Sequence, residues 1–250
     1  MKSPGVAPSV PKPEETQSIT ALESALIIIE DLHGKLTEAL STDNFQAQRE
    51  LTEKLQSELD KAKKIQRKLE GKETILSVDR TINLVDFLKK PESEGGLDIK
   101  WLDPTNPIAE SDPNNEGLTE IDLTKVSLDT SWLPEGKTYI KGEARLTALK
   151  SKDSTQTRLD LYVFASLWKL YKTDPTSFEE KMKIIAETSS ITIEDLKKKL
   201  LFFDGTIVRH SVGPRYALYL HWGGSSWAWH INGLLSEWHG HNPSLVLARH

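Results

Sequence analysis

The chain has 250 residues, a net charge of −5, 37% hydrophobic and 28% charged residues, and no cysteine. The length fits one large or two small domains, and the missing thiols exclude disulfide scaffolds, thiolate metal sites and cysteine nucleophiles. No apolar run approaches the ~20 residues of a membrane-spanning helix, and the N-terminus MKSPGVAPSVPKPEETQ lacks the apolar core of a secretory signal. We therefore expect a cytoplasmic protein with no membrane partner.

The first segment, residues 1–18, carries four prolines and almost no large apolar side chain, which predicts a disordered arm. Helical periodicity begins at residue 19. Apolar side chains alternate at spacings of four and three along one stripe: Leu22, Leu26, Ile29, His33, Leu36 and Leu40. After the turn residues 41–44, a second stripe follows: Leu51, Leu55, Leu59, Ala62, Ile65 and Leu69. The pattern predicts two long helices joined as a hairpin.

The apolar stripe of the second helix is narrow, because Glu58 interrupts it. Packing of the hairpin on itself then leaves apolar surface unused, which favours pairing with another chain or docking on the C-terminal half. We expect residues 19–70 to bind a partner or to self-associate through five anchors: Leu26, Ile29, Leu36, Leu55 and Ile65. The basic cluster that ends this helix fits the helix macrodipole better than a nucleic-acid contact.

Residues 72–90 form a further apolar segment, so the first structured region is predicted to be a helical hairpin plus an extra helix over residues 19–90. Pro91 and a Gly-Gly pair end it. The stretch 103–117 is acidic and has no Lys or Arg, which is typical of a solvated loop. We interpret residues 91–137 as an acidic, proline-rich linker with short strands.

Residues 138–250 carry the features of a compact C-terminal α+β domain. Helices are predicted over 143–149, 159–171, 177–187 and 193–200, with capping residues Thr176 and Thr192 before the last two. Asp204-Gly205 is a turn dipeptide, and alternating strands follow around the loop GGSS. If Trp222 pairs with Trp227, then Leu220 faces Trp229, and the tryptophans join the core of an antiparallel sheet. The fold class is therefore α+β, an N-terminal α-helical hairpin followed by helices packed on a Trp-rich antiparallel β-meander.

The segments YIKGEARLTALK, RLDLYVFASLWK, FFDGTIVRHSVGPRYALYLHW, WAWHINGLLSEW and NPSLVLA resemble a family of short bacterial proteins of uncharacterised function. The resemblance covers about residues 138–248 and leaves the helical hairpin outside it. It implies a domain boundary near residues 103–137. It implies no catalytic or binding residue.

Six of the seven histidines lie at or after position 210. Under the proposed pairing, two of them share one strand face, and neutral imidazoles are ligands for zinc. The candidate metal ligands are His221, His230, His239 and His241, with Asp204 or Glu237 as an acidic partner. No HExxH or comparable spacing is present, so a metal-dependent enzyme is the third hypothesis.

Three helices followed by a strand pair also match a winged helix-turn-helix protein. DNA contacts would then come from Lys197, Lys198, Lys199, Arg209 and Arg215. The three lysines are consecutive and spread around a helix, which weakens this alternative.

No phosphate-binding loop, dinucleotide fingerprint or nucleophile elbow occurs in the sequence, so we assign no catalytic residue and expect no cofactor. The leading hypothesis is a non-catalytic protein–protein interaction or scaffold protein that associates through its helical hairpin.

Overall fold

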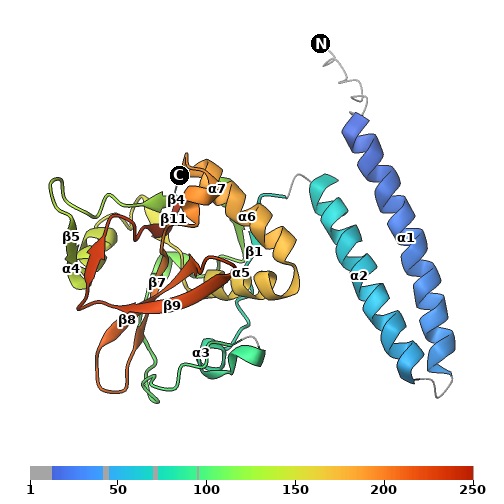
Figure 1. Ribbon diagram of the computed structural model, residues 1–250, viewed down its shortest axis with the longest axis horizontal. Coiled ribbons are helices and arrows are strands. Elements are labelled where there is room, and N and C mark those ends of the chain that lie inside the picture. The colour runs from blue at the N-terminus through green and yellow to red at the C-terminus, as the bar shows by residue number, and fades with distance from the viewer. Residues whose placement is uncertain (1–12, 42–44, 70–72, 95, 250) are drawn as a thin grey trace, which may run out of the picture. The chain divides into compact units, whose positions relative to one another are not determined.

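The computed structural model describes residues 13–41, 45–69, 73–94 and 96–249 (Figure 1). The chain has an α+β fold, as the sequence predicts, and divides into two compact units, Met1–Glu73 and Thr74–His250.

The first unit is the predicted helical hairpin, formed by α1 (Pro13–Leu40) and α2 (Phe45–Leu69), which run side by side (Figure 1). The first helix begins earlier than predicted, so residues 13–18 are helical rather than part of a disordered arm. Proline is tolerated in the first turn of a helix, where its missing N–H has no acceptor. The remainder of the predicted arm, 1–12, lies outside the described residues.

The second unit contains both helices and strands. Its α-helices are α3 (Leu84–Lys89), α4 (Gly142–Lys150), α5 (Leu161–Thr173), α6 (Pro175–Thr188) and α7 (Ile193–Leu196). Its 3₁₀ turns are Glu92–Glu94, Pro113–Asn115 and Leu123–Lys125. Its strands are β1 (Ile75–Ser77), β2 (Ile108–Ser111), β3 (Glu120–Asp122), β4 (Val126–Asp129), β5 (Tyr139–Lys141), β6 (Gln156–Arg158), β7 (Leu201–Arg209), β8 (Arg215–Trp222), β9 (Trp227–Gly233), β10 (Glu237–His239) and β11 (Ser244–Ala248).

The main sheet has the strand order β4-β11-β7-β8-β9, with β2 also paired to β7 and β6 to β11. The predicted meander is its β7-β8-β9 part, which is antiparallel. The pairing of β11 with β7 is parallel, so the sheet as a whole is mixed. Strand β7 is buried along almost its whole length, as expected for a strand covered on both faces.

The interpretation of residues 91–137 as a linker is corrected by the structure. Strand β2 pairs with β7 and β4 pairs with β11, so this stretch is part of the main sheet. The acidic segment is also not solvated throughout: Asp112 is 2% exposed, and its carboxylate accepts hydrogen bonds from the backbone N–H groups of Asn114 and Arg158. Likewise, the extra helix predicted before residue 90 exists as α3 but belongs to the larger unit.

The register predicted for the β8–β9 hairpin is confirmed. Trp222 pairs with Trp227, Leu220 with Trp229, and Leu218 with Ile231. The apolar face formed in this way packs into the main core of the unit.

Two local predictions at polar residues are wrong, each for a physical reason. Helix α6 is capped by Asp174, whose carboxylate accepts from the Ser177 N–H at 3.0 Å, and not by Thr176, because Pro175 takes the first helical position. The Asp204-Gly205 dipeptide is no turn but an irregularity within β7. A Cβ at Gly205 would lie 2.2 Å from the Arg158 carbonyl oxygen, so only glycine permits this approach.

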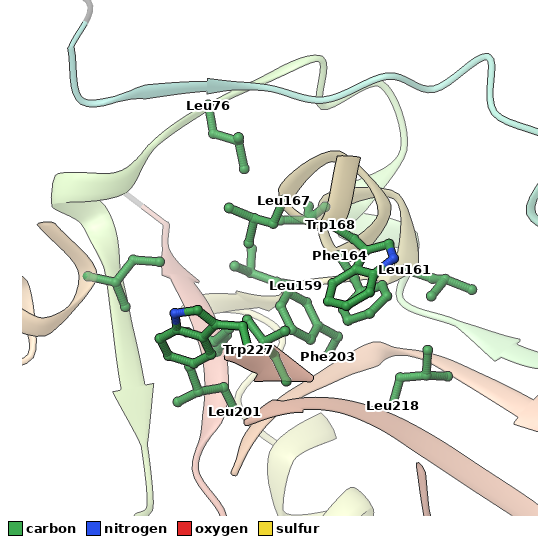
Figure 2. Packing of buried hydrophobic residues seen from close by; sticks show 14 of the residues in the cluster. Leu76, Leu159, Leu161, Phe164, Leu167, Trp168, Leu201, Phe203, Leu218 and Trp227 are labelled. Atoms are coloured by element: carbon green, nitrogen blue, oxygen red, sulfur yellow. The ribbon is translucent and has the colours of Figure 1, made fainter. Parts of the chain in front are cut away.

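The core of the larger unit fills both faces of the main sheet. On one face, α5 lays Phe164, Leu167 and Trp168 toward the sheet, where they meet Phe203 and Trp227 (Figure 2). A second cluster on the other face brings α4 against the sheet and includes Trp132, Leu146, Leu149, Phe202 and Trp238. Of the three strand tryptophans predicted in the core, Trp227 is 2% exposed, whereas Trp222 and Trp229 are half-buried and pack against the core from its edge.

Candidate protein interface

The two helices of the hairpin meet along a seam of apolar side chains. On α1, two columns of buried or half-buried residues repeat at heptad spacing: Leu22, Ala25, Ile29, Leu32, Leu36 and Ala39. The matching columns of α2 hold Gln48, Leu51, Leu55, Glu58, Ala62 and Ile65. Ala25 and Ala62 are the most buried members, at 6% and 7% exposure, since small side chains let the backbones approach closely.

A third apolar column on α1 lies beside this seam and is exposed. Ile19, Leu26 and Leu40 are 42%, 49% and 64% exposed, and His33 completes the seven-residue spacing. Leu26, His33 and Leu40 directly follow the seam residues Ala25, Leu32 and Ala39, so the column borders the seam. Helix α1 therefore carries three apolar columns, of which α2 covers two.

The corresponding column of α2 begins with Phe45, which is 75% exposed, and continues with Thr52 and the half-buried Leu59. Because the helices are antiparallel, equivalent heptad columns lie on the same side of the pair. We call this side of the hairpin, formed by Ile19, Leu26, His33 and Leu40 of α1 and Phe45, Thr52 and Leu59 of α2, the open flank.

The Gln48 side chain fixes how the two helices are aligned along their length. Its Nε2 donates to the carbonyl oxygen of Ala39 at 3.0 Å, so these two residues lie at one level. Counting outward at 1.5 Å per residue brings Leu40 near the level of Phe45 and Leu26 near that of Leu59. The open flank thus presents two apolar levels, separated by the polar level of His33 and Thr52.

The two helices of the hairpin differ in charge. Helix α1 has six Asp and Glu against one Lys, whereas α2 has seven Lys and Arg against four Asp and Glu. Exposed pairs within each helix, such as Lys35–Asp31 at 2.6 Å and Arg49–Glu53 at 3.0 Å, contribute little to stability. The difference in sign between the helices favours their pairing with each other.

Of the five anchors predicted from sequence, the structure leaves one exposed. Leu26 lies on the open flank, whereas Ile29, Leu36, Leu55 and Ile65 are half-buried in the seam. The predicted stripe mixed two columns, because the small residues Ala25 and Ala39 that complete the seam give a weaker signal than leucine. The exposed Ile19, Leu40 and Phe45 were not predicted as anchors, although their heptad spacing to Leu26 and Leu59 is visible in the sequence.

The lysines of the winged-helix alternative do not lie on a recognition helix. Helix α7 ends at Leu196 after a single turn, and not at residue 200 as predicted. The Lys197 Nζ lies 4.6 Å from the centroid of the Trp222 ring, and the Lys198 Nζ lies 2.8 Å from the Asp195 carboxylate. Lys199 follows in the same turn, its N–H donating to the Leu196 carbonyl.

The two arginines of that alternative lie at the ends of neighbouring strands. Arg209 ends β7, where its N–H donates to the Pro107 carbonyl at 2.8 Å. Arg215 begins β8 and forms ion pairs with Glu110 and Glu143, and the hydrogen bond that its guanidinium donates to the Glu143 carboxylate raises the pKa of Arg215. Its charge is compensated by two carboxylates of its own chain, which weakens a role in binding phosphate.

The four candidate histidines form two pairs. His221 and His230 flank Tyr219 on the sheet face opposite the main core, with ring centroids 5.6 and 6.0 Å from that of Tyr219. His239 and His241 stack on each other at 5.5 Å. Burial is the largest cause that lowers the pKa of both His221 and His241, and a neighbouring imidazole lowers each further, although a backbone hydrogen bond at Trp222 partly opposes the shift of His221. Within the described residues, no three His, Asp or Glu side chains converge as metal ligands would.

The larger unit contains a buried ion pair that was not predicted from the sequence. Arg145 of α4 donates from Nη1 and Nη2 to the two carboxylate oxygens of Asp204 at 2.6 and 2.8 Å, and from Nη2 to Ser244 Oγ at 2.6 Å. Both charged side chains are 0% exposed. Three aromatic rings surround the guanidinium at 4.2 to 5.1 Å, those of Trp132, Phe202 and Trp238. The pair is closed to solvent, so its role is to hold α4 on the sheet.

No protein-family model matches the chain, and searches of curated proteins and of solved structures give no significant match. The resemblance of residues 138–248 to short bacterial proteins therefore stays a prediction. None of the helices in the described part of the chain combines the length and apolar character needed to cross a membrane.

Proposed function

We propose that the protein is a non-catalytic, cytoplasmic association protein that binds a protein partner, or a further copy of itself, through the helical hairpin of residues 19–70. The observation that supports the proposal is the open flank. A two-helix hairpin that acted alone would gain by placing polar residues at these positions, since contiguous exposed apolar surface marks interaction sites.

The larger unit offers less apolar surface for such a contact. Its large hydrophobic side chains that are exposed, among the described residues, are Tyr139, Val212 and Leu235. They come from separate loops and strands and form no heptad column. The hairpin is therefore the better candidate for association.

The proposal is tested by affinity capture from native cells with three baits: the wild-type chain, a Leu26→Gln/Leu40→Gln variant, and an Ile27→Gln control. Ile27 is 67% exposed and lies on the side of α1 opposite the seam, so the control changes an equally accessible apolar residue outside the open flank. Every capture is run with and without nuclease and read by mass spectrometry.

We expect a nuclease-resistant protein, including untagged copies of the chain itself, with the wild-type and Ile27→Gln baits only. Recovery that is unchanged by the Leu26→Gln/Leu40→Gln substitutions would contradict association through the open flank. Recovery that disappears with nuclease would favour the DNA-binding alternative instead.

A further inference from the structure

We propose that the occupant of the open flank is the open flank of a second copy of this chain, so that two hairpins form a four-helix bundle. The inference rests on the proposed function and names its partner. In the bundle, α1 of each copy packs on α2 of the other, and the two-fold axis runs parallel to the helices.

The apolar levels of the open flank match themselves under this symmetry. A two-fold axis parallel to the helices keeps every residue at its own level, so Leu40 meets Phe45 of the second copy and Leu26 meets Leu59 of the second copy. Such an isologous contact uses the same patch on both copies. All neighbouring helices in the bundle are then antiparallel, as they are within each hairpin.

Charge selects this arrangement over its main competitor. A two-fold axis perpendicular to the helices would place α1 on α1, and would bring together two helices with six carboxylates and one lysine each. Glu23 and Glu30, in the column just outside the open flank, would then border another acidic helix. Placing α1 on the basic α2 of the second copy replaces this repulsion by attraction.

His33 and Thr52 give the interface a polar level between two apolar ones. A polar residue within an otherwise apolar helical interface fixes register and oligomeric state at a cost in stability. Replacing His33 by leucine would complete the apolar column from Ile19 to Leu40. The bundle therefore predicts a gain in affinity for His33→Leu, which a merely exposed histidine would not produce.

The first test is sedimentation equilibrium of the full chain and three variants at several concentrations. The wild type is expected at twice the monomer mass of 28.1 kDa. We expect the Leu26→Gln/Leu40→Gln dissociation constant to rise at least about tenfold and that of His33→Leu to fall, with Ile27→Gln unchanged. Helical circular dichroism serves as the folding control. Raising the salt concentration should weaken the dimer, because the charges of α1 and α2 attract.

The second test distinguishes the helix pairing, and it is clean because the chain has no native cysteine. A tagged Leu40→Cys chain and an untagged Phe45→Cys chain are mixed and oxidised. The proposed bundle predicts disulfides between the two different chains, since positions 40 and 45 meet across the interface. Preferential disulfides between two Leu40→Cys chains would overturn the pairing of α1 with α2.

A wild-type chain that remains monomeric at every concentration would overturn the second copy as occupant. If that monomer still captures another protein through Leu26 and Leu40, the proposed function survives while the dimer does not. A dimer that is insensitive to both the Leu26→Gln/Leu40→Gln and the His33→Leu substitutions would overturn the role of the open flank in both proposals.

Discussion

The two units of the chain treat their apolar side chains differently. Of the nine large hydrophobic residues that are exposed in the described part of the chain, six belong to the hairpin, although it is much the shorter unit. The larger unit instead buries most of its aromatic residues on both faces of its main sheet. The aromatic residues of its second cluster enclose the Arg145–Asp204 ion pair. The larger unit therefore covers most of its own apolar surface. The hairpin leaves apolar surface exposed, which a further helix pair could cover.

This contrast is open to a spectroscopic test, because all seven tryptophans lie in the larger unit. Tryptophan fluorescence therefore follows unfolding of that unit alone, whereas helical circular dichroism follows both units. The two signals therefore report on the two units separately.

The largest effect is expected from Asp204→Ala in the larger unit. The substitution leaves the Arg145 charge buried without its carboxylate, which costs about 3–5 kcal/mol. Urea unfolding followed by tryptophan fluorescence measures it. The control is Glu187→Ala, which removes an exposed pair with Lys183 at 3.8 Å and should change stability by no more than about 1 kcal/mol. Equal effects of the two substitutions would contradict the self-contained core.

The second largest loss of stability is expected from Trp227→Ala. The Trp227 ring packs edge-on against Phe178 at 5.6 Å, and its Nε1 donates to Glu179 at 2.8 Å. Losing a buried aromatic side chain costs about 3 kcal/mol through lost contacts and the cavity that remains. The half-buried Trp229 lies on the same sheet face, and Trp229→Ala should cost less. Both values come from urea unfolding, and a larger loss for Trp229→Ala would be inconsistent with the packing.

A smaller effect, the dependence of the melting temperature on protein concentration, distinguishes the two units. If the hairpin is completed by a second copy, its melting temperature rises with protein concentration, because association stabilises only the folded state. We expect the helical signal to shift upward by a few degrees for each tenfold increase in concentration, while the fluorescence midpoint stays constant. A helical melting temperature that does not change with protein concentration would show that the hairpin, like the larger unit, is stable without a second copy.

The smallest effect is a loss of stability that is expected only at acidic pH. Burial raises the pKa of Asp129, but hydrogen bonds from Gln156, Ser131 and Lys152 outweigh it and lower the pKa from 3.8 to about 2. Because the pKa of Asp129 is lower in the folded state, its ionised carboxylate stabilises the fold at pH values above the unfolded pKa. This contribution is lost as the pH falls from about 4 to about 2. The stability difference between wild type and Asp129→Asn, measured by urea unfolding, should therefore be full at pH 6 and narrow below pH 4. A gap that is constant with pH would show that these hydrogen bonds do not favour the charged form.

The accuracy of the sequence predictions follows from how local each signal is. The β8–β9 register was predictable because two alternating strands and a four-residue loop leave one pairing that gathers the apolar side chains. The seam of the hairpin was only half predictable, since Ala25 and Ala39 contribute by their small size and not by their hydrophobicity.

Other parts could not be predicted from local pattern. Short strands were predicted within residues 91–137, but strands of four residues such as β2 and β4 give no signal of the strands they pair with, so the stretch was interpreted as a linker. The pairing of Arg145 with Asp204 joins residues 59 positions apart, and no spacing rule connects them. The cluster of histidines was visible in the sequence, yet the fold divides it into two pairs.

The place of β11 in the sheet has a consequence for the order of events during synthesis. This strand joins β4, β6 and β7, all of which leave the ribosome before it. The hairpin, whose contacts are local, is translated earlier still, by roughly 9 to 35 s at typical rates of 5–20 residues per second. Hairpins of chains growing on neighbouring ribosomes are therefore available to pair while the main sheet of each chain still lacks a central strand.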